Sequence, residues 1–276
     1  MQIRFQNSPQ ETTRMSTQQL RESFLVQDLF RDDKLSIIYS HYDRMIIGGV
    51  SPVMNPIELQ SHSELRAEYF LERREIGIIN VGGSGIVEAD QERFELQKLD
   101  CVYLGKGIKN VRFSTAEKNL PAAFYFLSAP AHKTYPNKFL VKQDASHMSL
   151  GEQATANKRT IYKYIHVQGI QSCQLVMGLT LLNDGSVWNT MPAHTHTRRT
   201  EVYFYFDLAP PERVLHVMGQ PQETRHLIVA NHEAVISPPW SIHSGCGTSN
   251  YGFIWGMAGE NLDYTDMDPA PITELK

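Results

Sequence analysis

Three histidines and one glutamate stand in an order that limits how the C-terminal half of this chain can fold. The order is His194-x-His196-x4-Glu201, followed later by His243. Residues i and i+2 of a strand point to the same face of a sheet, so the first two imidazoles can reach one ion. The polar residues 197–200 suit a turn, which lets the carboxylate swing back to join them. These spacings predict strands that converge on a single site.

The four side chains have the chemistry of a transition-metal site. Imidazole nitrogen and carboxylate oxygen suit Zn, Mn, Fe, Co or Ni, and four protein ligands leave room for water or substrate. Residues 234–238 read as a strand ending at a proline, and a hairpin partner would carry His243 inward just beyond it. Isolated histidine pairs often share no role, but the full set within a β pattern favours a metal. Cys246 as a fifth ligand is the weaker interpretation, because cysteine more often packs as a small apolar side chain.

Short strand signals separated by turn residues dominate the chain. Strands are expected at residues 36–39, 44–47, 76–81, 102–104, 123–127, 160–166, 174–182, 202–206, 214–218, 226–229, 234–237 and 252–257. A capping box at Ser16 and Gln19 precedes an apolar stripe of Leu20, Phe24 and Leu25, so one helix is predicted over residues 17–26. Many short strands at this spacing favour a sandwich or barrel.

Two β-rich blocks of the chain repeat each other at an offset of 133 residues, the separation of Glu68 and Glu201. This alignment places the following residues opposite the four ligand positions: Ser61 for His194, Ser63 for His196, Asn110 for His243 and Glu68 for Glu201. Serine and asparagine are poor ligands for such an ion, so one metal is expected per chain. Two domains are therefore expected, residues 1–145 without a metal site and residues 146–276 with one.

Composition excludes several function classes. The 276 residues are 41% hydrophobic and 20% charged, as in a soluble globular protein. A net charge of -4 gives no general attraction to nucleic acid or to an anionic membrane. We expect no signal peptide in the polar residues 1–22, and no apolar run approaches the ~20 residues of a membrane span. Three widely spaced cysteines read as free thiols of a cytoplasmic protein.

The site pattern resembles the two signature motifs of the cupin superfamily. The first motif corresponds to Gly185 with the two histidines and Glu201, and the second to Pro238, His243 and Asn250. The resemblance implies an all-β tandem cupin, with two double-stranded β-helix barrels and a short N-terminal helix. Cupins host unrelated chemistries, so this fold alone does not choose an activity.

Five longer runs are similar to the 5-keto-4-deoxyuronate isomerase family, the 4-deoxy-L-threo-5-hexosulose-uronate ketol-isomerases. They cover residues 69–75, 188–196, 201–206, 218–226 and 240–245, and the likeness runs from about Leu20 to the C-terminus. The resemblance implies a bicupin enzyme of pectin degradation that forms homo-oligomers, usually hexamers. It also implies one zinc in the C-terminal cupin, held by His194, His196, Glu201 and His243.

The implied reaction moves a hydrogen between C1 and C2 of 4-deoxy-L-threo-5-hexosulose uronate and gives 3-deoxy-D-glycero-2,5-hexodiulosonate. A metal would stabilise the enediolate that forms, and a general base would carry the proton from one carbon to the next. The sequence does not identify this base, for which Glu223 and Tyr203 are the candidates. Arg199 or Arg225 could hold the substrate carboxylate through a bidentate contact.

Two rival functions stay open. A cupin dioxygenase can also use three histidines and one glutamate, but with iron. A non-catalytic cupin would bind a uronate without turnover. Metal analysis and oxygen consumption distinguish the first rival from an isomerase, and a turnover assay distinguishes the second.

Overall fold

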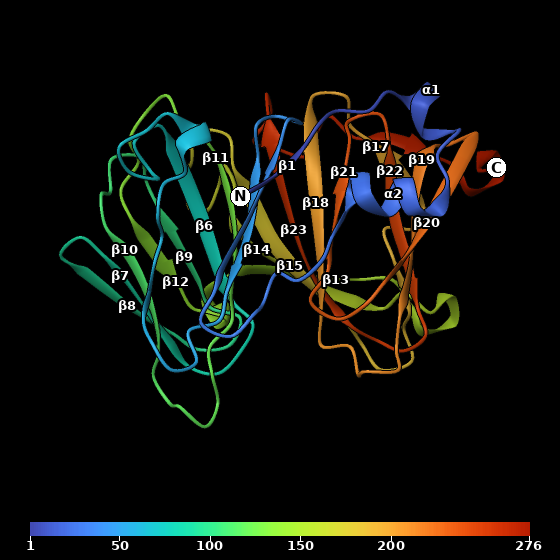
Figure 1. The fold of residues 1–276 in the computed structure, drawn as a ribbon. Coiled ribbons are helices and arrows are strands. Elements are labelled where there is room, and N and C mark those ends of the chain that lie inside the picture. Colours follow the sequence, from blue (N-terminus) through green and yellow to red (C-terminus); the bar gives the residue numbers. More distant parts are fainter. The chain divides into compact units, whose positions relative to one another are not determined.

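The computed structural model describes residues 1–276, and strands dominate it (Figure 1). The chain divides into two compact units. The N-terminal unit comprises Met1–Ile3, Asp28–Ser146 and Tyr164–Val176, and the C-terminal unit comprises Arg4–Gln27, His147–Lys163 and Met177–Lys276. The expected boundary between residues 145 and 146 lies beside one of these divisions. Each unit, however, also takes a segment from the other half of the sequence.

Two sheets form the N-terminal unit. The larger has the strand order β1-β3-β4-β11-β6-β9-β12, and the smaller has the order β5-β10-β7-β8. The larger sheet consists of β1 (Gln2–Arg4), β3 (Leu35–Ser40), β4 (Ile46–Val50), β6 (Arg74–Asn80), β9 (Cys101–Leu104), β11 (Phe124–Pro130) and β12 (Lys138–Leu140). The smaller consists of β5 (Ile57–Glu58), β7 (Gly85–Ala89), β8 (Glu92–Leu96) and β10 (Val111–Thr115). Two 3-10 helices, η1 (Ser63–Leu65) and η2 (Lys142–Asp144), lie in the connections.

The core of the N-terminal unit is apolar and draws on both of its sheets. Val87 on β7 and Phe113 on β10 come from the smaller sheet, and Ile76, Phe124 and Phe126 come from the larger; none is exposed. The Phe113 ring lies 5.3 Å from that of Phe124 and 6.4 Å from that of Phe126. Full burial of each such side chain contributes about 1.5–3 kcal/mol. This interior is therefore filled with hydrocarbon.

The C-terminal unit is built in the same way, with one extra pair of strands. Its larger sheet has the order β13-β14-β15-β23-β18-β21-β2, its smaller sheet the order β16-β22-β19-β20, and β17 pairs with β24. The larger sheet consists of β2 (Leu25–Val26), β13 (Ser146–Leu150), β14 (Arg159–Ile165), β15 (Val176–Leu182), β18 (Arg199–Phe206), β21 (Ala234–Ser237) and β23 (Gly252–Gly259). The others are β16 (Trp188–Asn189), β17 (Ala193–Thr195), β19 (Val214–Gln220), β20 (Glu223–Val229), β22 (Ile242–Gly247) and β24 (Asp268–Ala270). The helices here are α1 (Pro9–Thr12), α2 (Thr17–Phe24), η3 (Gln153–Thr155) and η4 (Ile272–Glu274).

The matching strand orders support the internal repeat, but the register corrects the residues placed opposite the ligands. Glu201 on β18 pairs with Ser237, the last residue of β21, and Ile76 on β6 pairs with Leu104, the last residue of β9. Ile76 is therefore the counterpart of Glu201, and Glu68 lies in the loop before β6. The fixed offset failed because the chain from Glu201 to Ser237 is longer than that from Ile76 to Leu104. The connection at residues 207–213 is longer than that at residues 81–84, and β19 and β20 are each longer than β7 and β8.

The same comparison identifies the counterpart of His243. His243 on β22 pairs with Met218, and Phe113 on β10 pairs with Val87. Met218 and Val87 each stand two residues before the end of the strand that enters the hairpin. A buried phenylalanine and a buried isoleucine thus occupy two of the four ligand positions in the N-terminal unit, and neither can bind a metal.

The predicted N-terminal helix is present but ends earlier than expected. Helix α2 begins after the capping box formed by Ser16 and Gln19 and runs to Phe24. Leu25 has an extended backbone, and β2 pairs with β21 through Leu25 and Val235. The last two residues of the predicted helix, Leu25 and Val26, therefore form an edge strand of the sheet instead. Leu20 and Phe24 are buried, as the apolar stripe predicted.

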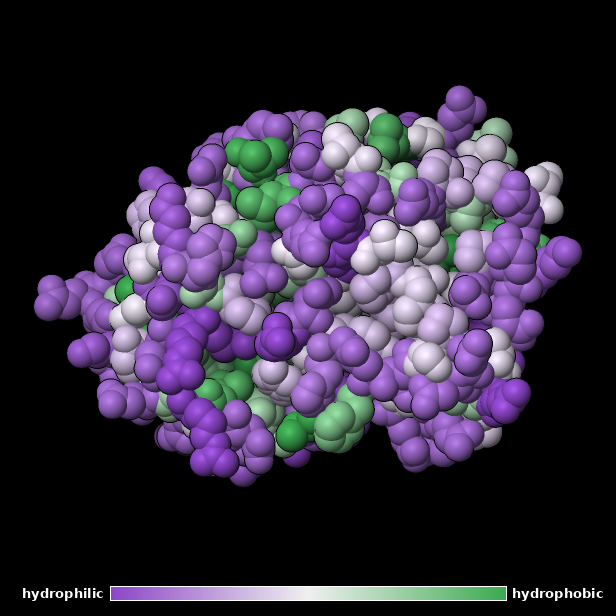
Figure 2. All heavy atoms as spheres, turned by 90° about the horizontal axis from the view of Figure 1, so that it is seen from above, coloured by the Kyte–Doolittle hydropathy of each residue, from purple (hydrophilic) through white to green (hydrophobic).

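The predicted all-β class is confirmed by these sheets. None of the helices is long and apolar enough to cross a membrane. Hydrophilic side chains cover most of the face drawn in Figure 2, and the hydrophobic ones gather there in small, separate groups.

Candidate metal centre

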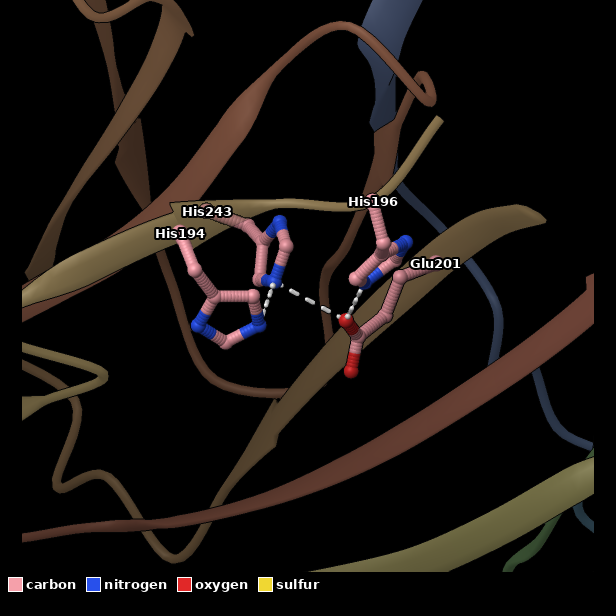
Figure 3. Close-up of side chains that lie close together, drawn as sticks. All are labelled: His194, His196, Glu201 and His243. Atoms are coloured by element: carbon pink, nitrogen blue, oxygen red, sulfur yellow. Dashed lines mark hydrogen bonds and ion pairs between the residues drawn. The ribbon is translucent and has the colours of Figure 1, made fainter. Parts of the chain in front are cut away.

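Four side chains of the C-terminal unit meet at one place (Figure 3). His194 belongs to β17, Glu201 to β18 and His243 to β22, and His196 follows the end of β17. Their ligand atoms all lie within 4.8 Å of one another, and all four except His194 are buried. The chain turns at residues 197–198, between the second histidine and β18. The structure thus brings the four predicted ligands together by the turn that the sequence predicted.

Backbone carbonyl groups fix which nitrogen of two imidazoles faces the cluster. Nδ1 of His196 lies 3.0 Å from the carbonyl oxygen of Arg199. Nδ1 of His243 lies 3.3 Å from the carbonyl oxygen of Ser241. A carbonyl oxygen only accepts, so in the neutral rings Nδ1 carries the proton and Nε2 presents a lone pair. This arrangement is typical of metal-binding histidines.

When the imidazoles of His196 and His243 are neutral, their converging nitrogens and the carboxylate oxygen are all acceptors. Oε2 of Glu201 lies 2.9 Å from Nε2 of His196 and 2.9 Å from Nε2 of His243. Nε2 of His194 lies 3.1 Å from Nε2 of His243. Lone pairs at these distances repel one another unless protons or a cation stand between them. Three nitrogens and one carboxylate oxygen therefore fit a divalent transition metal.

Burial and mutual charge shift the acid–base properties of the cluster. Burial and the nearby charge of His243 lower the pKa of His194 to about 3. Burial also acts to raise the pKa of Glu201, but the charges of His243 and His196 and their hydrogen bonds leave it below its usual range. At neutral pH the cluster thus offers an ionised carboxylate and a neutral His194 imidazole, the forms that bind metal.

A cavity of about 460 Å³ adjoins the cluster. The lining side chains come mainly from β13, β14, β15, β23 and β18, which are neighbours in the larger sheet. Besides His194, His196 and Glu201, they are Met148, Leu150, Arg159, Ile161, Lys163, Thr180, Thr190, Pro192, Arg199, Tyr203, Phe253, Trp255, Met257, Tyr264 and Met267. A mostly apolar wall with a few polar groups is typical of a site for a small molecule.

The two candidate bases lie in different places. Tyr203 lines the cavity, and its phenolic oxygen lies 2.8 Å from Oγ1 of Thr190. Burial and the charge of Glu201 raise the pKa of Tyr203 well above its usual value, so its oxygen keeps its proton at neutral pH. Glu223 is exposed at the start of β20 and does not line the cavity. The structure therefore brings Tyr203 and not Glu223 to the cluster.

The two candidate arginines already have partners. Arg199 is fully buried, and its guanidinium forms an ion pair of 2.7 Å with Asp266. The Arg225 guanidinium donates to the carbonyl oxygens of Thr13 and Met15 at 3.2 and 2.6 Å, and it does not line the cavity. Arg225 thus holds the N-terminal segment, while Arg199 lies in the cavity wall with its charge balanced.

Sequence reasoning missed two cations of the cavity wall, Arg159 and Lys163 on β14. With Ile161, they are alternate residues of one strand, so they share one face. This alternation was the available signal, but nothing near them in the sequence suggested a site. Their strand lies between β13 and β15, its neighbours in the chain, and only the order of the whole sheet brings it to the same cavity as β18.

A separate cavity of about 720 Å³ lies in the N-terminal unit. Ser61, Glu68 and Asn110 line it, but no histidine or cysteine does. These side chains therefore share a surface without forming a nitrogen-rich metal site.

Sequence comparisons relate this chain to one protein family and to one kind of enzyme. Residues 24–272 match the KduI/IolB family. The chain is 52% identical over 276 residues to the 4-deoxy-L-threo-5-hexosulose-uronate ketol-isomerase of Shouchella clausii (strain KSM-K16), covering 100% of both chains.

Solved structures show the same fold at low identity. An IolB-like protein from Salmonella typhimurium LT2 has a TM-score of 0.72 at 17% identity, covering 89% of this chain and 96% of that one. Oxalate decarboxylase of Bacillus subtilis, described with Mn(II) centres, has a TM-score of 0.56 at 10% identity, covering 81% and 71%. The cupin architecture expected from the motifs is thereby confirmed.

Proposed function

The chain belongs to the KduI/IolB family, and from this premise we propose that it is the isomerase of 4-deoxy-L-threo-5-hexosulose uronate. The observation that carries the proposal is the identity of 52% over the full length of a ketol-isomerase, together with a buried ligand cluster beside a cavity. The product would be 3-deoxy-D-glycero-2,5-hexodiulosonate, formed in the degradation of pectin.

A ketol isomerisation needs a proton removed from a carbon next to a carbonyl group and returned one carbon away. A divalent metal held by His194, His196, Glu201 and His243 would supply Lewis-acid stabilisation of the negative charge on oxygen. We propose zinc for this role, because nitrogen-rich sets with one carboxylate suit it. The cluster lies in the wall of the cavity, so a substrate there has its reacting carbons beside these residues.

We propose Tyr203 as the donor to the substrate oxygen, because a phenol that keeps its own proton cannot take up the carbon-bound one. Its phenolic oxygen is buried, protonated at neutral pH and hydrogen-bonded to Thr190, so it has a defined position in the cavity. A neutral phenol can donate to a substrate oxygen that becomes negative during the reaction. Its ring and that of His243 lie nearly perpendicular, with 5.3 Å between the ring centroids. Tyr203 thus lies beside the cluster without being one of its ligands.

The surroundings of the enzyme are proposed from the family resemblance. We infer that the protein works in the cytoplasm as a homo-oligomer, a hexamer as in the family.

Arg199 remains part of the proposed site as a residue of the cavity wall, although its guanidinium is paired with Asp266.

The test is incubation of purified protein with 4-deoxy-L-threo-5-hexosulose uronate, followed by NMR. We expect loss of the aldehyde hydrate signal, without oxygen or nicotinamide, and full inhibition by a chelator. Turnover only in the presence of oxygen would instead favour the iron dioxygenase. Tight binding of the uronate without any turnover would favour the passive binding protein.

A further inference from the structure

Two positively charged side chains line the cavity without an acidic partner. Arg159 and Lys163 are half-buried on β14 and face the cavity together with Ile161. The Arg159 guanidinium donates to the carbonyl oxygen of Asn157 at 2.8 Å, and the Lys163 ammonium lies 5.6 Å from the centre of the Tyr264 ring. Neither forms an ion pair with a carboxylate. Their charges are therefore available to a ligand.

The other charges of the cavity wall are already balanced. Arg199 is paired with Asp266, and the carboxylate of Glu201 faces the imidazoles of the cluster. Glu201 is also the only acidic residue of the lining. An excess of two positive charges is thus left on β14, where a ligand carboxylate would find no competing anion from the protein.

The strand order separates these cations from the cluster. In the larger sheet, β14 is followed by β15, β23 and β18, so three strand spacings lie between the cations and Glu201. At about 4.8 Å per spacing, the backbones are about 14 Å apart along the sheet. The gap left for a ligand is shorter, because the sheet curves and both cations have long side chains. A six-carbon uronate carries its carboxylate at the end opposite the aldehyde. It can reach both groups because the long side chains of Arg159 and Lys163 line the same cavity as His194, His196 and Glu201 and cover part of the separation.

We propose that Arg159 and Lys163 bind the carboxylate of the uronate substrate and so direct its aldehyde end to the metal cluster, an inference that rests on the proposed function. This assigns to β14 the role that the sequence had suggested for Arg199 and Arg225. The two cations are positioning residues that decide which sugars the site accepts.

The middle of the cavity suits the rest of such a substrate. Phe253 and Trp255 on β23 and Ile161 on β14 line it, and the Trp255 indole donates to Oγ1 of Thr180 at 3.1 Å. An apolar wall accepts the deoxygenated carbon of a 4-deoxy sugar more readily than a hydroxylated one. The guanidinium of Arg159 is half-buried and has lost part of its water, which lowers its pKa. A carboxylate bound there gains more from the charge than it would in open solvent.

The sequence offers a matched control for the charge. Lys158 precedes Arg159 and lines a different cavity with Thr160 and Tyr162, on the opposite face of the strand. Lys158→Gln thus removes one positive charge from the same segment without touching the proposed site. Arg159→Lys keeps the charge and loses the planar fork, so it tests charge and geometry separately.

The experiment measures two quantities on metal-loaded protein. The first is kcat/KM for the uronate substrate, and the second is the affinity ratio for D-galacturonate over neutral D-galactose by calorimetry. Arg159→Gln and Lys163→Gln should each lower both by about 10- to 100-fold, the loss of a hydrogen bond to a charged group. Arg159→Lys should recover part of the loss, and Lys158→Gln should behave as wild type. Metal content should stay unchanged in all variants.

Two results would overturn the proposal. One is wild-type protein that binds galacturonate no better than galactose. The other is a galacturonate preference in Arg159→Gln and Lys163→Gln equal to that of Lys158→Gln. Absence of turnover in wild-type protein would refute the isomerase function instead, and the binding ratios would still decide the role of the two cations.

Discussion

Substitution of His243 by alanine tests whether the cluster is a metal site. His243 is central in the cluster, because its Nε2 lies 2.9 Å from Oε2 of Glu201 and 3.1 Å from Nε2 of His194. His243→Ala removes one of four ligands and leaves His196 and Glu201 in contact at 2.9 Å. The remaining three side chains stay on β17, β18 and the turn between them. The variant therefore removes one ligand and leaves the strands that hold the other three in place.

The expected loss follows from the number of ligands. Four-ligand zinc sites bind with about 10–16 kcal/mol, so one ligand in four accounts for roughly 2.5–4 kcal/mol. At about 1.4 kcal/mol per factor of ten, affinity should fall by about 100- to 1000-fold. The measurement is competition with a chromophoric chelator, supported by elemental analysis after dialysis. Wild-type protein should retain one metal per chain, and His243→Ala should lose nearly all of it.

His226→Ala is the matched control, because this histidine is exposed on β20 and outside the cluster. It should bind metal as the wild type does. The melting temperature gives a second measurement, since a ligand that binds only the folded state raises it. A chelator should lower it for the wild type and the control, but not for His243→Ala. An unchanged metal affinity in His243→Ala would refute the assignment of the site.

Three further predictions concern other parts of the molecule. Tyr203→Phe should lower kcat by about 100-fold with metal content unchanged, since it removes a proton-bearing oxygen from the cavity; unchanged kcat would exclude Tyr203 from proton transfer. In metal-free protein, the depressed pKa of Glu201 adds stability above its ordinary value of 4.5, and this is lost as the pH falls below it. Urea unfolding at pH 7 and pH 4 should therefore show a smaller difference for Glu201→Gln, and an equal difference would contradict this. Glu75→Ala should destabilise the N-terminal unit by about 3–5 kcal/mol, because this buried carboxylate accepts from Tyr103 and from the amides of Cys173, Gln174 and Leu175. All three tryptophans lie in the C-terminal unit. In Glu75→Ala, the unfolding transition followed by circular dichroism should therefore begin at lower denaturant than the transition followed by tryptophan fluorescence. If both transitions coincide with those of the wild type, Glu75 does not stabilise the N-terminal unit.

The metal ligands could be predicted because their signal is local. His194, His196 and Glu201 lie within eight consecutive residues, and strand periodicity with one turn brings them together. His243 required only the assumption of one neighbouring strand. The order of residues along a short segment thus contained most of the geometry of the cluster.

The wall of the cavity could not be predicted in this way. Glu223 and Arg225 were chosen because they are close to the ligands in the sequence, but they lie on β20, at the edge of the smaller sheet. Arg159 and Lys163 are more than 30 residues from the nearest ligand, and β14 reaches the cavity only through its place in the larger sheet. The counterparts of the ligands in the N-terminal unit were misplaced for a related reason, since a fixed offset cannot follow loops and strands of unequal length.

The exchange of segments between the two units has a consequence for the order in which the protein can fold during synthesis. Residues 4–27 are synthesised before the rest of their unit, but Leu25 pairs with Val235, and the Arg225 guanidinium binds the carbonyl oxygen of Met15, 210 residues earlier. The N-terminal unit likewise needs Tyr164–Val176, so it is incomplete when residue 146 leaves the ribosome. Contacts at this separation form late, because the loop they close is long. Helix α2 therefore waits for β20 and β21, with its apolar face uncovered until these strands are synthesised.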